Sequence, residues 1–257
     1  MLKFKNVSAG YNGKDIIKDI SFNLAKGESL AIIGPNSCGK TTLLRAAAGI
    51  IEHKGDIKLS GQSIKDLKRK EIAGKIALMS QINYVHFPYT VYETVMMGRY
   101  RFLRQNIFGK PSKEDLAIVK KTMESTKLID LKDKPLNVLS GGQLQRVYLA
   151  HTLVQEPEII LLDEPTNHMD MKHQIDVVNF LKGWASVNNH AVIGVFHDLN
   201  LAMELTENLL FMKEGRIFGK GKAKKLITSK FLKEIYDVDI VSYMTKSLGR
   251  WQEFEKE

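Results

Sequence analysis

The sequence predicts an α/β fold with a mostly parallel β-sheet, a small N-terminal antiparallel β-subdomain and an inserted α-helical subdomain. Short apolar runs of strand length alternate with longer amphipathic stretches, which is typical of parallel strands joined by helices. The 257 residues are 44% hydrophobic and 26% charged, so the chain is long enough and apolar enough to enclose a substantial core. At this length one large domain is as plausible as two small ones.

Strands are expected where apolar residues alternate with polar ones or form a short uninterrupted run. In the first third of the chain these are Leu2–Val7, Ile16–Leu24, Ser29–Ile33, Ile57–Leu59 and Ile76–Ser80. The first two alternate and therefore predict antiparallel pairing with one exposed face. The third is apolar and stops at Gly34, and Thr41–Ala48 then has the spacing of a helix.

Helical spacing dominates from about residue 87 to residue 153, which predicts the inserted helical subdomain. Its expected helices are Val91–Leu103, Lys113–Thr126 and Gln143–Val154. Strands return at Ile159–Asp163, Ala191–Phe196 and Asn208–Met212, with a helix at Met171–Asn188. In the C-terminal tail, residues 223–257, we expect two short helices and a strand within Ala223–Tyr243, followed by a polar end that frays.

Composition and charge exclude some classes of protein. The single cysteine, Cys38, excludes an internal disulfide, and no apolar stretch approaches the roughly 20 residues that span a bilayer. The N-terminal residues lack the apolar core of a signal peptide, so we expect a cytosolic location. The net charge of +9 comes from scattered lysines and arginines, which favours a solvated surface over a nucleic-acid site.

A glycine-rich segment follows the predicted strand Ser29–Ile33 and matches the phosphate-loop pattern G-x-x-x-x-G-K-[ST]. It reads Gly34, Pro35, Asn36, Ser37, Cys38, Gly39, Lys40, Thr41, Thr42. Glycines in such a loop let backbone N–H groups turn toward phosphate oxygens, and the following helix adds its positive end. The pattern predicts that Lys40 reaches the β- and γ-phosphates and that the Thr41 hydroxyl binds Mg²⁺.

Two carboxylates and a histidine follow later strands. The apolar run Ile159–Leu162 ends in Asp163 and Glu164, which is expected of a buried strand that carries acids to a metal site. His197 comes directly after the predicted strand Ala191–Phe196.

The segment Leu139-Ser140-Gly141-Gly142-Gln143 lies between the phosphate loop and this acidic pair. In that order, the three motifs resemble the nucleotide-binding domain of the ATP-binding cassette (ABC) family over nearly the whole chain. The resemblance implies a single domain over residues 1–257 with a P-loop NTPase core, ATP and Mg²⁺ as ligands, and ATP hydrolysis coupled to transport.

The resemblance also implies roles for single residues. Asp163 would hold Mg²⁺ through water, Glu164 would orient or deprotonate the attacking water, and His197 would contact the γ-phosphate. Gln81 is similar to the glutamine that contacts Mg²⁺ and links ATP to the helical subdomain. Tyr11 is similar to the aromatic residue that stacks on adenine.

One position departs from the family pattern. Ser37 stands where relatives usually have glycine, so we expect a positive φ there, which is uncommon for a residue with a side chain. We expect nucleotide binding to survive this difference.

The segment around Ser140 implies that two chains act together. Ser140, Gly141, Gly142 and Gln143 would open a helix whose free N–H groups cap the γ-phosphate bound by the opposite subunit. Asp170 resembles an aspartate that crosses this interface. The resemblance therefore implies a homodimer in the ATP-bound state, with the same surface used twice.

Several stretches resemble importers of iron chelates, haem and cobalamin, namely Phe87–Tyr100, Phe196–Ala202 and Tyr236–Ile240. This implies an ATPase bound to a membrane permease on the cytoplasmic side of the cell membrane, together with an extracytoplasmic substrate-binding protein and no nucleic acid. Manganese and zinc importers share the first stretch and remain the nearest alternative. Two further alternatives are a soluble ABC ATPase acting on ribosomes or DNA and the nucleotide domain of an exporter.

Overall fold

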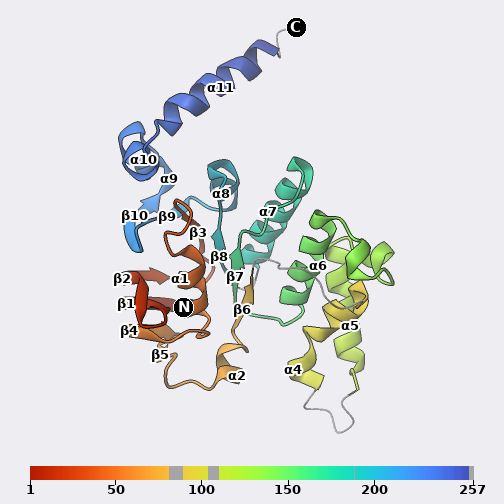
Figure 1. Cartoon of the computed structure of the whole chain (residues 1–257). Helices are drawn as coiled ribbons and strands as arrows, with labels where there is room; N and C mark the ends of the chain where they lie inside the picture. Colours follow the sequence, from red (N-terminus) through yellow and green to blue (C-terminus); the bar gives the residue numbers. More distant parts are fainter. Residues whose placement is uncertain (81–88, 104–109, 188, 255–257) are drawn as a thin grey trace.

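The computed structural model describes residues 1–80, 89–103, 110–187 and 189–254. Its strands form two sheets, and its helices cover the larger sheet and build a separate group on one side (Figure 1).

The smaller sheet is the predicted N-terminal antiparallel unit. Its strands are β1 (Leu2–Tyr11), β2 (Lys14–Leu24), β4 (His53–Leu59) and β5 (Gln62–Ser63), in the order β2-β1-β4-β5. β1 pairs antiparallel with β2 on one side and with β4 on the other. The alternating pattern therefore predicted the pairing correctly, although both leading strands are longer than expected.

The larger sheet has the strand order β10-β9-β3-β8-β7-β6. Its strands are β3 (Ser29–Ile33), β6 (Ile76–Met79), β7 (Ile159–Asp163), β8 (Ala191–Val195), β9 (Asn208–Lys213) and β10 (Arg216–Lys222). Neighbours pair in parallel except for β10, which forms an antiparallel hairpin with β9 at the sheet edge. β10 was not expected, because Gly219 and Gly221 weaken its strand pattern.

Both faces of the larger sheet are buried, which explains why its central strands are uninterrupted apolar runs. Leu30 and Ile32 face a core shared with the smaller sheet and α1 (Lys40–Ala47). Ala31 and Ile33 face the opposite core, which is covered by α7 (Met171–Ser186) and α8 (Leu199–Leu205). The result is a layered α/β fold with α1 between the sheets (Figure 1).

The helical group contains α3 (Val91–Met97), α4 (Tyr100–Leu103), α5 (Lys113–Ser125) and α6 (Gly141–Leu153). Single turns of 3-10 helix lie at Ile129–Leu131 and Leu136–Val138, and the short helix α2 (Arg69–Ile72) lies elsewhere, before β6. Residues of α3, α5 and α6 share a core of their own.

The predicted single helix over 91–103 is wrong, because the chain breaks between α3 and α4 at Gly98 and Arg99. A Cβ at Gly98 would lie 2.5 Å from the carbonyl oxygen of His151, so α3 and α6 approach at backbone distance. Arg99 is buried, and its guanidinium lies 2.8 Å from Asp115 and 2.6 Å from Glu156. The chain turns inward at Arg99, because its buried guanidinium must reach these two carboxylates.

The predicted strand in the tail is also wrong. The tail consists of α9 (Ala223–Leu226), α10 (Ser229–Tyr236) and the 15-residue helix α11 (Ile240–Phe254). Met244, Leu248 and Trp251 recur at helical spacing, which favours one helix over an alternating strand. Only the first residues of α11, Ile240 and Val241, pack against the core, and the rest projects away from the body (Figure 1).

Among the described residues, none of the helices combines the length and the apolar character needed to cross a bilayer.

Replacing Arg99 with Met is expected to lower the free energy of unfolding by about 3–5 kcal/mol, because the buried carboxylate of Asp115 would lose its partner. Burial alone raises the pKa of Asp115, but hydrogen bonds from Ser112 and Arg99 outweigh it and lower the pKa below its usual value. Such a group stabilises the fold above its unfolded pKa, and this contribution is lost as the pH falls through the folded pKa, below about 4.

Urea unfolding near neutral pH and again in acid would measure this difference. Lys120→Met is the matched control, because its ion pair with Glu124 is exposed and is expected to contribute about 0.5 kcal/mol or less. Equal losses in the two variants would contradict the assigned role of Arg99.

Candidate functional site

The candidate site lies where neighbouring parallel strands of the larger sheet end. The phosphate loop follows β3, Asp163 ends β7, and His197 comes shortly after β8. These three strands are adjacent in the order β3-β8-β7, so their carboxyl ends share one edge of the sheet. Gln81, predicted after β6, lies outside the described residues.

The phosphate loop has the backbone that the sequence predicted. Ser37 adopts φ 62° and Gly39 adopts φ 101°, so the expectation of a positive φ at Ser37 is confirmed. A Cβ at Gly34 would lie 2.2 Å from the carbonyl oxygen of Met212, which explains why only glycine fits there. Asn36 and Ser37 are exposed at the tip of the loop, and Thr42 is buried behind it.

Lys40 begins α1 and is buried within the loop. Its Nζ donates hydrogen bonds of 2.8 Å to the carbonyl oxygens of Gly34 and Pro35. The ammonium is therefore held inside the curve of the loop, next to the backbone N–H groups that would face a phosphate. Cys38 is buried in the same loop, and burial raises the pKa of its thiol, so the sulfur stays protonated and acts as a small packing group.

Thr41 and Asp163 form a pair suited to a hard cation. Asp163 is buried and forms a side-chain hydrogen bond with Thr41, while its Oδ1 has no hydrogen-bond partner. Burial raises the pKa of Asp163, and the nearby negative charge of Glu164 raises it further, against the lowering effects of Thr41, Arg45 and Lys40. An unpaired carboxylate oxygen beside a hydroxyl matches the oxygen ligands that Mg²⁺ prefers.

The described residues contain no group of three or more His, Cys, Asp or Glu side chains that could hold a metal ion on their own. Mg²⁺ usually keeps several waters and also binds phosphate, so Asp163 and Thr41 would supply only part of its oxygen ligands.

Glu164 is held in place from two sides. Its Oε1 lies 2.5 Å from Nε2 of His197, and its Oε2 accepts a hydrogen bond of 2.5 Å from Nδ2 of Asn167. The side chain is 16% exposed and that of His197 is 41% exposed, so both can meet a ligand in solution. The sequence did not predict the direct contact between Glu164 and His197. It also did not single out Asn167, and only the place of this residue in the turn after Glu164 could have pointed to it.

Tyr11 lies at the end of β1 and is 38% exposed. Its hydroxyl accepts a hydrogen bond of 3.0 Å from Arg45 of α1, the helix that follows the phosphate loop. This bond fixes the ring near the nucleotide-binding loop, although stacking on adenine stays a prediction.

Ser140 caps the N-terminus of α6. Its Oγ accepts from the N–H of Gln143, and the Gln143 side chain accepts from the N–H of Ser140. α6 packs near β6 at the sheet edge, whereas α1 packs between the two sheets (Figure 1). Gly141 belongs to α6 and the phosphate loop precedes α1, so the two lie in different parts of the molecule. A role of Gly141 across a dimer interface stays a prediction.

Asp170 caps α7 within its own chain. Its carboxylate accepts a hydrogen bond of 2.9 Å from the N–H of His173 and lies 2.8 Å from that residue's Nδ1. The preceding turn packs on the cap of α6, because a Cβ at Gly141 would lie 3.0 Å from Cβ of His168. Contact of Asp170 with a second subunit stays a prediction.

Comparisons with known proteins agree with this arrangement. The family model described as "ABC transporter" matches residues 17–167. The chain is 39% identical over 247 residues to the uncharacterized ABC transporter ATP-binding protein YvrA of Bacillus subtilis (strain 168). That match covers 96% of this chain but 56% of YvrA, so the chain spans little more than half of that relative's length.

A second relative is matched over most of both lengths. The probable siderophore transport system ATP-binding protein YusV of the same organism is 37% identical over 236 residues, which cover 91% of this chain and 85% of YusV. Among solved structures, the dimeric ATP-binding cassette MJ0796 in a post-hydrolysis state with ADP and Pi has a TM-score of 0.75 at 28% identity, covering 86% of this chain and 98% of that one. The chain belongs to the ABC transporter family and carries its ATPase domain.

Proposed function

We propose that this chain is the ATP-hydrolysing subunit of an ABC importer that powers uptake of an iron chelate, haem or cobalamin through a separate membrane permease. The observation that carries the proposal is the similarity to YusV, a probable siderophore transport ATPase, over 91% of this chain. A role in manganese or zinc import is not favoured, because that relative is named for siderophore transport.

The site residues divide the work of hydrolysis. The phosphate loop and Lys40 bind the β- and γ-phosphates, and Tyr11 orients the adenine. Mg²⁺, held by Thr41 and Asp163 with Gln81 as a further proposed contact, would supply charge neutralisation on the phosphates. Glu164 then orients or deprotonates the attacking water.

The contacts of Glu164 support its role as the base. Asn167 and His197 each bind one of its oxygens, which fixes the carboxylate before a water arrives. His197 is more exposed than Glu164, so it can exchange this contact for one to the γ-phosphate.

A second copy completes the site in this proposal. Ser140, Gly141, Gly142 and Gln143 at the start of α6 would cap the γ-phosphate held by the opposite chain, and Asp170 would lie at the same interface. The dimeric state of MJ0796, whose fold this chain shares, supports that arrangement.

The surface for the permease is proposed at the end of the molecule that carries α2 and α4 (Figure 1). Large apolar side chains are exposed on α3, on α4 and just after α1, namely Ile50 (57%), Tyr92 (37%), Met97 (41%) and Tyr100 (57%). A groove of about 350 Å³ lined by Ile50, Ile72 and Leu78 lies beside them. An exposed apolar patch with a groove is typical of a protein interface. We infer that the ATPase works at the cytoplasmic side of the membrane, with a substrate-binding protein on the other side.

Replacing Glu164 with Gln is expected to lower ATP turnover by about 10²–10⁴-fold while ATP binding persists, because the amide cannot accept the proton of water. The variant should therefore accumulate as an ATP-bound dimer. Phosphate release and light scattering after gel filtration would measure the two effects. Glu207→Gln, at an exposed carboxylate, is the control and should behave like the parent protein. Normal phosphate release by Glu164→Gln would refute the assignment.

Replacing Asp163 with Asn is expected to abolish Mg²⁺-dependent ATP hydrolysis and yet to raise the melting temperature without Mg²⁺. Because the folded pKa of Asp163 is raised, its ionisation above that pKa opposes folding, and a neutral amide removes this penalty at neutral pH. Calorimetry with and without Mg²⁺ would show both effects. Asp133→Asn, at a highly exposed carboxylate, should change neither, and a lower melting temperature for Asp163→Asn would contradict the analysis.

Replacing Ile50 and Met97 together with Ser is expected to abolish recovery of the chain with its permease from detergent-solubilised membranes, because both side chains are exposed on the proposed docking surface. ATP-dependent dimerisation should persist. Val187→Ser, at a 55% exposed site on a different element, is the matched control. Recovery with ribosomes in place of a membrane protein would overturn the importer proposal itself.

A further inference from the structure

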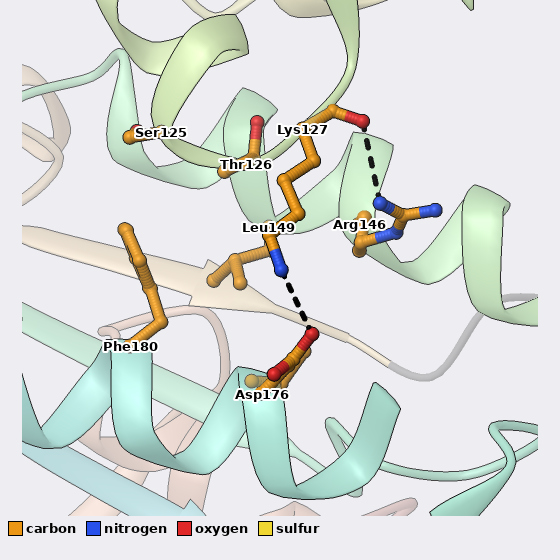
Figure 2. A pocket seen from close by; sticks show the side chains of 8 residues that line it. Ser125, Thr126, Lys127, Arg146, Leu149, Asp176 and Phe180 are labelled. Atoms are coloured by element: carbon orange, nitrogen blue, oxygen red, sulfur yellow. Dashed lines mark hydrogen bonds and ion pairs between the residues drawn. The ribbon is translucent and has the colours of Figure 1, made fainter. Parts of the chain in front are cut away.

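A small cavity lies at the junction between the helical group and the core. Its volume is about 150 Å³, and it is bounded by the end of α5, by α6 and by α7 (Figure 2). We call it the seam pocket and define it by its lining residues, which are Ser125, Thr126, Lys127, Arg146, Leu149, Asp176, Val177 and Phe180. None of these lining residues belongs to the nucleotide site proposed above.

One side of the seam pocket is apolar. Leu149 and Val177 are buried, and Phe180 is half-buried beside them. These side chains come from two different helices, α6 and α7, so the apolar wall spans the junction (Figure 2). An apolar cavity of about 150 Å³ can hold a benzene ring. The seam pocket therefore fits a single aromatic ring, which can pack against the ring of Phe180.

The other side of the seam pocket is basic. Lys127 forms an ion pair of 3.0 Å with Asp176, the one carboxylate of the lining, so these two charges offset each other. The remaining charge is that of Arg146. Within the described part of the chain, no carboxylate forms an ion pair with Arg146. The lining thus keeps one uncompensated positive charge.

The guanidinium of Arg146 also lacks an acceptor. Its Nη1 donates a hydrogen bond of 3.3 Å to the carbonyl oxygen of Lys127, whereas its Nε is buried and has no hydrogen-bond partner (Figure 2). A buried donor without an acceptor lowers stability, so an incoming acceptor is favoured. A carboxylate suits this position, because a guanidinium can bind both of its oxygens side by side. These features favour an anionic ligand over a neutral or cationic one.

We propose that the seam pocket binds a small aromatic carboxylate, with the ring against the apolar wall and the carboxylate on Arg146, and that this site is coupled to the ATP site. Binding of the ligand does not depend on the importer proposal. The coupling does rest on the proposed function, since it uses the role of Glu164 and the ATP-bound dimer.

Both helices that flank the seam pocket are tied to the turn after Glu164. From α6, Nε2 of Gln145 donates a hydrogen bond of 3.3 Å to the carbonyl oxygen of Glu164. From α7, Nε2 of Gln174 donates a hydrogen bond of 3.2 Å to the carbonyl oxygen of Thr166. Gln145 directly precedes Arg146 in the sequence. A ligand that bridges α6 and α7 therefore acts on the turn that carries the proposed base.

The same two helices begin at the segments proposed for the dimer interface. Ser140 caps α6 and Asp170 caps α7, and the two caps are packed together, since a Cβ at Gly141 would lie 3.0 Å from Cβ of His168. Coupling between two binding sites is reciprocal, so ATP must change the affinity for the ligand by the factor by which the ligand changes the affinity for ATP. The Kd of the ligand is therefore expected to differ between the ADP-bound and ATP-bound forms.

Isothermal titration calorimetry of the whole chain with benzoate tests the site. Saturating ADP and Mg²⁺ are present, so that the phosphate loop is occupied and does not bind the carboxylate. For a ligand of this size we expect a Kd on the order of 1 mM. Benzylamine has the same ring and the opposite charge, and its Kd should be about tenfold higher or more. Equal affinity for the two ligands, or no binding of benzoate, would overturn the inference.

Two substitutions test the position of the carboxylate. Arg146→Gln should raise the Kd of benzoate by about tenfold or more, because an uncharged amide replaces the guanidinium. Arg216→Gln, at an exposed arginine of β10, is the matched control and should leave the Kd unchanged. An unchanged Kd in a folded Arg146→Gln variant would contradict the proposed contact. If that variant does not fold, the comparison of benzoate with benzylamine still decides whether the site exists.

A third titration tests the coupling. In the Glu164→Gln background, the Kd of benzoate is expected to differ by about fivefold or more between saturating ADP and saturating ATP. Equal Kd values in a variant that forms the ATP-bound dimer would overturn the coupling. A variant that never dimerises with ATP would count against the proposed function instead, and the titrations with ADP would then decide the ligand site alone.

Discussion

The parallel register of three central strands is the constraint on which the site depends. Asp163 of β7 lies opposite Val195 of β8, and Val195 in turn lies opposite Ile32 of β3. The phosphate loop, Glu164 and His197 therefore all emerge just beyond one row of paired residues. Because both faces of these strands are buried, a shift of register would expose apolar side chains, and packing thus fixes the geometry of the candidate site. The contact between Glu164 and His197 follows from this alignment.

At this edge of the sheet, two residues are held in arrangements that lower the stability of the fold. Asp163 is kept as a buried carboxylate with one unpaired oxygen, an arrangement that favours the neutral acid until a cation arrives. Ser37 holds a backbone conformation that usually requires glycine. The apolar cores on the two faces of the larger sheet offset both losses of stability. A bound cation would relieve the penalty at Asp163. Unfavourable arrangements of this kind are common at active sites.

The sequence predicted most of this site because local patterns report local chemistry. An apolar run predicts a strand, a glycine-rich segment predicts a phosphate loop, and paired acids after a strand predict a metal site. Two kinds of feature were missed: the break at Gly98 depends on a distant contact with the backbone of α6, and the hydrogen bond from Asn167 to Glu164 depends on the exact shape of a turn. The strand predicted within Ala223–Tyr243 is absent because this stretch forms α9, α10 and the first turn of α11, and the helical spacing of α11 is visible only over its whole length.

The proposal that one chain holds only part of the reaction centre agrees with the same topology. The phosphate loop follows a central strand, but α6 lies over the edge strand β6, so the fold separates the two segments that we propose to enclose one ATP. In the proposed dimer, twofold symmetry would bring these two segments together twice, once for each ATP.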